Sequence, residues 1–346
     1  MAGLASQALD ASGCLAASVL AGHHLWLAVF LFVLAFGLAL WPHYSSSKFS
    51  SFVPVSASGT TLLHSFLGLS LILVAQACFV FAHHSYAVPS YLYLSADYAS
   101  VTAVFVHHLN IAGLLIIGGS AHVAVSVLRD LAVTSSLCAI IIIIVIIIIV
   151  VGFDLLAHRC LITGHLAFLV LFLGLHSFGI LTHNDTLQAL GRQSDLFSDN
   201  ALQLKPVLAL WLQSTRTVAY DIDTLGSRVV SMAQELGTAD FITHHIHAFT
   251  THITLLVVLK GCLYSRSSRL IFDKMILGFR FPCDGPGRGG SCQVSAQDHV
   301  FLALFWAHNS LSVVIFHSHW KLQSDVWGSI GQQSAVQHLT GGDFSI

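Results

Sequence analysis

Charged residues are scarce in this chain of 346 residues: they make up 9% of it, whereas hydrophobic residues make up 55%. Soluble domains carry charge on about a quarter of their residues, so the composition excludes an ordinary soluble domain. The charges also nearly cancel, with 14 Lys and Arg against 16 Asp and Glu. A polyanion would therefore meet no broad basic surface, which excludes nucleic-acid binding. We expect a membrane protein.

Basic residues are missing from the first twenty positions, and the apolar stretch that follows runs on to Trp41. A cleaved signal peptide needs a basic start and a short apolar region, so this stretch is expected to be a span. A bilayer core of about 30 Å needs about 20 apolar residues per helix. Six membrane helices of an all-α, polytopic protein are therefore predicted, at 22–42, 61–82, 100–127, 164–183, 241–263 and 299–320.

No soluble domain and no internal repeat is visible between these helices. We divide the chain into membrane helices at 1–264 with a long loop at 184–240, a Gly/Pro-rich loop at 265–298, and a last helix with its tail at 299–346. If both termini share one side, nine of the fourteen Lys and Arg lie on the other side. The positive-inside rule makes that other side, with the loop at 265–298, cytoplasmic or stromal. The termini and the long loop are then lumenal.

Carboxylates are almost absent from the predicted spans, yet of 22 histidines only His43, His158 and His338 lie away from apolar segments. An unpartnered imidazole in hydrocarbon costs on the order of several kcal/mol. Hydrogen bonds between helices could satisfy any single one. The whole set, without carboxylates for a metal site or proton relay, is typical of axial ligands to many flat tetrapyrroles. Neighbours such as His107 and His108 point about 100° apart on a helix, so each would serve a different macrocycle.

Two of the seven cysteines, Cys283 and Cys292, lie in the glycine-rich segment FPCDGPGRGGSC at 281–292. A disulfide is one interpretation. An iron–sulfur site explains more of the segment, because glycines let backbone N–H groups approach the sulfurs and Arg288 offsets negative charge. A cubane cluster needs four cysteines, so another chain with a similar loop must supply two.

This loop resembles the cluster-binding loop of the two large photosystem I core proteins, PsaA and PsaB, and other segments resemble the PsaA branch of that family. The matching segments are CQVS at 292–295, DHVF at 298–301, VVIFH at 313–317, WKLQSDVWG at 320–328, LSADY at 94–98, HSFG at 176–179, HNDT at 183–186, FSD at 197–199, GTADF at 237–241 and HHIHAF at 244–249. The resemblance covers the chain from about residue 22 and corresponds to the fourth to ninth of the family's eleven membrane helices. It implies a split subunit whose remaining helices, with the special pair and phylloquinone, lie on separate chains.

The resemblance makes Cys283 and Cys292 ligands of FX, a 4Fe-4S cluster shared with PsaB, in a loop that includes Asp284 and Arg288. It implies that Asn309 holds water on an accessory chlorophyll. Most members of a set of histidines are implied to bind chlorophyll magnesium: His24, His64, His107, His108, His122, His165, His176, His183, His244, His245, His247, His252, His299 and His317.

The function implied by the resemblance is that of a segment of the photosystem I reaction-centre core in a thylakoid membrane, of a plastid rather than a cyanobacterium. The chain would hold chlorophyll a, carotenoids such as β-carotene and lipids, and half of FX. The whole complex would carry electrons from plastocyanin or cytochrome to ferredoxin, and the chain alone would be inactive. Expected partners are PsaB, the ferredoxin-like two-cluster protein PsaC, chains with the missing helices, and light-harvesting proteins.

Two alternatives remain open. A multi-haem membrane cytochrome would use histidines in pairs and need no cysteine loop, and an absorption spectrum separates haem from chlorophyll. An antenna-only relic would keep pigments without the cluster, which electron paramagnetic resonance of the assembled complex would detect.

The Ile/Val run at 140–151 is predicted not to cross the membrane. A complete span there would invert every later helix and place the Cys283 loop on the lumenal face. It would also separate Arg129 from Arg159, and the 17 residues at 137–153 are short for a span. We expect a stromal or re-entrant segment. A structure in which 140–151 crosses from face to face, with the two arginines on opposite sides, would contradict this.

Overall fold

The computed structural model describes residues 25, 57–87, 98–129, 155–215, 236–321 and 323. Within these ranges the chain is helical and has no strand. The helices are α3 (Ala57–Ala87), α5 (Tyr98–Arg129), α7 (Arg159–Ala189), the 3-10 turn η3 (Gln193–Asp195), α8 (Val207–Thr215), α9 (Thr238–Leu263), α10 (Lys274–Leu277) and α11 (Ala296–Lys321). Five of them, α3, α5, α7, α9 and α11, contain stretches long and apolar enough to cross a bilayer. The predicted all-α, polytopic class is confirmed.

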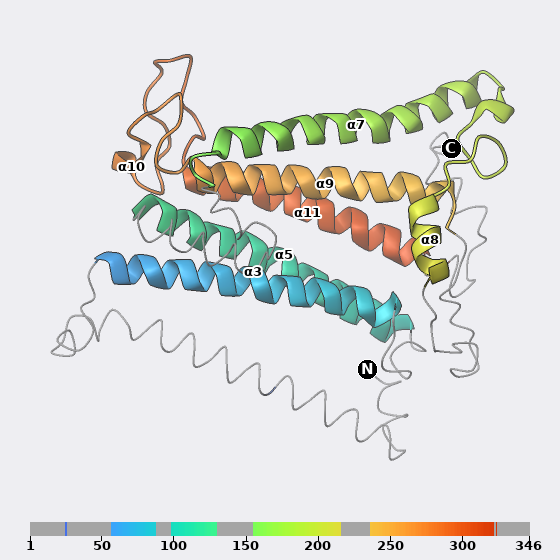
Figure 1. Cartoon of the computed structure of the whole chain (residues 1–346), viewed down its shortest axis with the longest axis horizontal. Helices are drawn as coiled ribbons and strands as arrows, with labels where there is room; N and C mark the ends of the chain where they lie inside the picture. Colours follow the sequence, from blue (N-terminus) through green and yellow to red (C-terminus); the bar gives the residue numbers. More distant parts are fainter. Residues whose placement is uncertain are drawn as a thin grey trace.

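The five long helices lie side by side, and successive ones run in opposite directions (Figure 1). Helix α5 contacts α3, α9 and α11, while α9 also contacts α7 and α11. Helices α5, α9 and α11 therefore form the centre, and α3 and α7 flank it. The ends of α5 and α9, the starts of α7 and α11, and α10 gather at one end of the bundle, which we call the loop end (Figure 1).

The structure changes several expected boundaries. Helix α7 continues to Ala189, so residues 184–189 belong to a helix and not to the long loop, and that loop contains η3 and α8. Helix α3 starts four residues before the predicted 61 and ends five after the predicted 82. The expected span at 22–42 and the Ile/Val run lie outside the described residues. Arg129 and Arg159, on either side of that run, end α5 and begin α7 at the loop end (Figure 1).

Helices α3 and α5 touch backbone to backbone at two glycines. A Cβ atom built on Gly119 would lie 2.7 Å from the carbonyl oxygen of Gly68, and one on Gly68 would lie 2.7 Å from the carbonyl oxygen of Gly119. Small residues allow such approach between membrane helices, where apolar lipid leaves packing as a main source of association. The sequence thus uses glycine where the two helices cross.

Large apolar side chains of α7 are exposed. Leu161, Phe168, Phe172, Leu175 and Phe178 are all more than half exposed. Such a surface would be unfavourable in water, where a contiguous apolar patch marks a binding surface. It suits a helix that faces lipid or bound pigment.

We expect Gly119→Ala to lower the stability of the assembled protein, because the new methyl group would meet backbone atoms of α3 that cannot move independently. Overpacking of this kind costs about 1–3 kcal/mol. The midpoint of thermal unfolding of the purified complex measures it. The matched control is Gly118→Ala, since nothing lies within 4 Å of a Cβ atom there. Equal midpoints for both variants would contradict the close contact.

Candidate pigment and cluster site

Six histidines share one hydrogen bond: Nδ1 donates to the backbone carbonyl four residues earlier, at 2.6–2.9 Å. A neutral imidazole has one N–H group, so this bond places the proton on Nδ1 and leaves the lone pair on Nε2. That tautomer is the one that can bind a metal through the outer end of the ring. The six residues are His84, His108, His165, His245, His252 and His299.

His84 was not among the histidines expected to bind pigment. It is exposed near the end of α3, and its Nδ1 lies 2.8 Å from the carbonyl oxygen of Val80. The neighbouring His83 lies with its ring edge-on to that of His84. The signal available in the sequence was the position of His84 at the edge of an apolar segment, which does not by itself reveal the tautomer.

Two pairs of expected ligands touch one another across helix interfaces. Nδ1 of His64 on α3 lies 2.9 Å from Nδ1 of His122 on α5, and the two rings are stacked. Nε2 of His247 on α9 lies 2.9 Å from Nδ1 of His317 on α11. Hydrogen bonds between helices, the alternative interpretation for single histidines, are therefore present at these two places.

The remaining expected ligands have diverse surroundings. His176 on α7 lies edge-on to His245 on α9, with ring centroids 4.8 Å apart. The rings of His107 and His108, and those of His244 and His245, are also nearly perpendicular, as expected for neighbours on a helix. Nε2 of His183 donates to the carbonyl oxygen of Asp195 at 2.8 Å. In this histidine the proton is therefore on Nε2 and is used in a contact with the protein. Asn309 is exposed on α11, and His24 lies outside the described residues.

A groove of about 800 Å³ lies along α7 next to α9. Its lining is mostly apolar and includes Leu171, Leu175, Phe178 and, from α9, Phe249. Gly174 lets Phe249 approach, because a Cβ atom there would be 3.0 Å from that ring. A volume of this size and character can hold a long hydrocarbon chain or one edge of a macrocycle.

The cysteine loop stands outside the helices at the loop end. Cys283 and Cys292 are both exposed free thiols on this loop. Gly285, Gly289 and Gly290 have positive φ angles of 80° to 105°, which only glycine adopts readily. Backbone turns of this kind can direct N–H groups to one side, where they stabilise negative charge.

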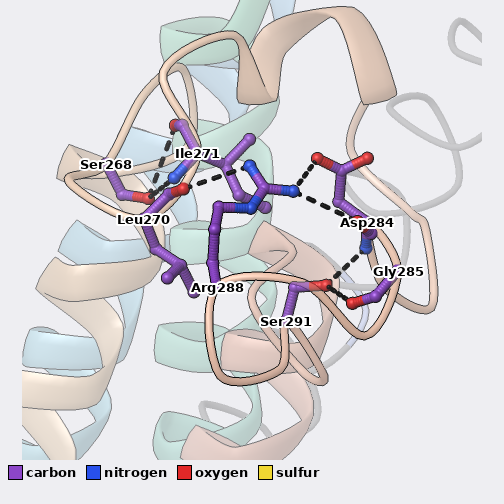
Figure 2. A network of polar contacts seen from close by, with 7 residues as sticks. All are labelled: Ser268, Leu270, Ile271, Asp284, Gly285, Arg288 and Ser291. Carbon is purple, nitrogen blue, oxygen red and sulfur yellow. Dashed lines mark hydrogen bonds and ion pairs between the residues drawn. The ribbon is translucent and has the colours of Figure 1, made fainter.

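A polar network holds the loop in shape (Figure 2). The hydroxyl of the buried Ser291 accepts from the backbone N–H of Asp284 at 2.7 Å and donates to the carbonyl oxygen of Gly285 at 2.8 Å. Arg288 forms an ion pair with Asp284 and donates to the carbonyl oxygen of Leu270. These contacts fix the shape of the loop that carries both cysteines.

Arginines fasten the loop region to the ends of the helices. Arg266 donates to the carbonyl oxygens of Val127 and Leu128 at the end of α5. Arg159 donates to those of Leu263, the last residue of α9, and of Ser267 just beyond it. Both cations satisfy terminal carbonyl groups and lie at the negative end of a helix dipole.

A buried lysine adds a further cation at this end. Lys274 is only 3% exposed. Burial lowers the pKa of its ammonium group to about 8, and the neighbouring Arg159 and Lys260 contribute to the same shift. The loop end thus concentrates positive charge close to the segment that carries the two thiols.

No group of three or more His, Cys, Asp or Glu side chains suited to a metal ion occurs in the part of the chain that the structure describes. The thiols of Cys283 and Cys292 amount to two ligands. A thiolate-bound cluster at this loop would need its other ligands from elsewhere.

Comparisons with known proteins show which chains this one is similar to. The model of the family described as "Photosystem I psaA/psaB protein" matches residues 55–235 and 222–342. "Photosystem I P700 chlorophyll a apoprotein A1" of Heterocapsa triquetra is 49% identical over 318 residues. The match covers 87% of this chain and 43% of that relative, so the chain spans less than half of the relative's length.

We expect Ser291→Ala to loosen the cysteine loop. The change removes the acceptor for the N–H of Asp284 and the donor to Gly285, and losing a buried partner costs about 1–3 kcal/mol. Loop cleavage by a protease in intact membranes should accelerate roughly tenfold, the equivalent of about 1.4 kcal/mol. Gly287→Ala is the control, because a Cβ atom there meets nothing within 4 Å. An unchanged cleavage rate in the Ser291 variant would show that the network does not order the loop.

Proposed function

The chain belongs to the photosystem I psaA/psaB family, and we propose on that basis that it is a segment of the reaction-centre core that binds chlorophyll a and supplies two ligands of the FX cluster. The observation that carries the cluster assignment is the pair of exposed thiols, Cys283 and Cys292, on one ordered loop. PsaB would supply the other two thiolates. The complete complex would carry electrons from plastocyanin or cytochrome to ferredoxin.

The residues of the loop fit a thiolate-bound cluster. Thiolates are the ligands that iron–sulfur clusters use, and their exposure leaves the opposite side open to a second loop from another chain. Arg288, Arg280 and the glycine-rich backbone provide positive charge or N–H dipoles around a negatively charged group. A disulfide between the two thiols would need neither the nearby arginines nor the backbone N–H groups that stabilise negative charge.

When bound, the cluster supplies a one-electron carrier, and the protein sets its position and electrostatic surroundings. Cys283 and Cys292 would fix the cluster at the loop end, where the bundle ends and a partner can dock. The exposed Arg280 and Arg288 would attract an acidic partner such as the ferredoxin-like two-cluster protein PsaC. The chain's own part in electron transfer is thus to hold half of one carrier within reach of the next.

Chlorophyll binding is supported by the histidine tautomers. His108, His165, His245, His252 and His299 each place the proton on Nδ1, which leaves Nε2 as a magnesium ligand. His84 joins them on the same evidence. The other expected histidines remain candidates without this preset tautomer, and Asn309 remains a candidate for a water-mediated contact.

The groove along α7 offers a place for the hydrophobic parts of such ligands, whether phytyl chains, carotenoids or lipids. Its apolar lining would contact a hydrocarbon chain over a long distance. The exposed phenylalanines and leucines of the same helix would be covered in an assembled, pigmented complex. We place that complex in a thylakoid membrane, of a plastid by preference, together with light-harvesting proteins and chains that carry the remaining helices of a split PsaA protein.

The multi-haem alternative fits the histidines less well. A haem held by two histidines would separate their nitrogens by about 4 Å, twice a metal–nitrogen bond of about 2 Å. In the two cross-helix pairs, the 2.9 Å contacts join Nδ1 to Nδ1 and Nε2 to Nδ1, which leaves no room for an iron between those atoms. The antenna-only relic is disfavoured by the ordered cysteine loop, since a chain without the cluster has no use for two thiols held in this way.

Replacing Cys283 or Cys292 with Ala should abolish the low-temperature electron paramagnetic resonance signal of FX, because each removes one of four cluster ligands. Chlorophyll bound by distant helices should be largely retained, as measured by pigment extraction. Cys160→Ala is the matched control: this thiol is also exposed at the loop end but lies on α7, outside the loop. A cysteine-loop variant that assembled with a normal signal would show the ligand assignment to be wrong.

A further inference from the structure

Helix α8 exposes three large apolar side chains at its start. Val207, Leu208 and Trp211 are 63%, 76% and 62% exposed. Residues three and four positions apart are neighbours on a helix, so Trp211 lies beside both of the others and the three form one surface. Among the described elements, none packs extensively against α8. An exposed apolar surface of this kind marks a place that another molecule or phase covers.

Hydrogen bonds hold the start of α8 at the level where α9 begins. The backbone N–H of Leu204 donates to Oγ1 of Thr238, the first residue of α9, at 3.0 Å. The N–H of Thr238 in turn donates to Oδ1 of Asp199 at 2.9 Å. Only Lys205 and Pro206 separate Leu204 from α8. The depth of α8 in the membrane is therefore set by the depth at which α9 starts.

That depth is the boundary between lipid and water. Helix α9 has 26 residues and is suited to crossing a bilayer. Such a helix is about 39 Å long, whereas the hydrocarbon core is about 30 Å thick. The ends of α9 thus extend only a short way past the hydrocarbon, into the layer of lipid head groups. Helix α8 starts in the same layer.

The direction of α8 also fits this boundary. It runs across the direction of α7, α9 and α11, at the end of the bundle opposite the loop end (Figure 1). When the long helices cross the bilayer, α8 lies along the membrane surface. With nine residues it is about 13 Å long, too short to span a bilayer. Its length and direction are those of a helix that lies in the interface.

The residues of α8 and its flanks have the chemistry of an interfacial helix. Tryptophan prefers the membrane–water boundary, where its apolar ring and polar N–H group are both satisfied. The exposed Lys205 precedes the helix and can reach a lipid phosphate while its stem lies on apolar groups. Because depth, direction and composition all agree, the bilayer is the occupant that this apolar surface fits.

We propose that α8 is an interfacial helix whose Val207, Leu208 and Trp211 insert among the lipids of the membrane leaflet opposite the cysteine loop. The contact would hold the connection between α7 and α9 against the membrane surface. It is a lipid-binding function separate from pigment and cluster binding, and it depends on neither of them.

Photo-cross-linking in native membranes tests what covers α8. Leu208 is replaced by an amino acid with a diazirine side chain in the complete complex, and adducts are identified by mass spectrometry after illumination. We expect lipid adducts. The control carries the same amino acid at Ser194, an exposed position of the same loop, and should react mainly with water. Adducts at position 208 with another protein, with a pigment or with water alone would overturn the proposal, as would equal lipid labelling at both positions.

A charge at the same position gives an independent measurement. Leu208→Asp should speed amide hydrogen exchange of residues 207–215 roughly tenfold or more in lipid nanodiscs, because aspartate is far less favourable than leucine among lipids. Position 208 is the second residue of α8, where a carboxylate favours the helix itself, so faster exchange reports lost lipid contact. Asn200→Asp adds the same charge at an exposed loop position and should leave exchange unchanged. Equal exchange in the two variants would contradict insertion of α8.

Discussion

A neutral imidazole has one N–H group and one lone pair, and when it is buried each of them needs a partner. This requirement governs the structure of the bundle. In a hydrocarbon environment no solvent can accept the proton or occupy the lone pair. The protein meets the first need with backbone carbonyls inside the helices or with a second imidazole across an interface. The second need stays open at many positions. The proposed chlorophylls would occupy these lone pairs, which would account for apolar surface and lone pairs on the same helices.

At the loop end, the groups that need partners are the carbonyl groups that end the helices, and arginines supply those partners. The carbonyl groups that end α5 and α9 attract Arg266 and Arg159, and these contacts bring the loop region onto the bundle. Once anchored, the loop is shaped by the Ser291 and Arg288 contacts and presents its two thiols outward. The cations that secure the fold lie at the same end of the bundle as the two exposed thiols.

The sequence was sufficient for the membrane class and for the approximate positions of the five spans that the structure describes, because these depend on apolar length. It could not reveal that His247 and His317 touch, since 70 residues separate them and the contact depends on how α9 packs against α11. It likewise missed the short helix α8 inside the long loop and the tautomer of His84. Each of these depends on tertiary packing or on side-chain rotamers, which hydropathy does not encode.

The distribution of unsatisfied groups also explains why the chain is suited to assembly. Helix α7 exposes large apolar side chains, the cysteine loop exposes two thiols, and two buried histidine nitrogens have no hydrogen-bond partner among the described residues. In the proposed assembly, other molecules would cover the apolar side chains, complete the ligand set of the thiols and satisfy the histidine nitrogens. Each of these steps would lower the free energy of the bundle, so pigment binding, cluster formation and association with neighbouring chains would stabilise the same structure. In the proposed assembly, folding and cofactor loading would therefore be coupled, and removing one class of ligand would weaken the contacts on which the others depend.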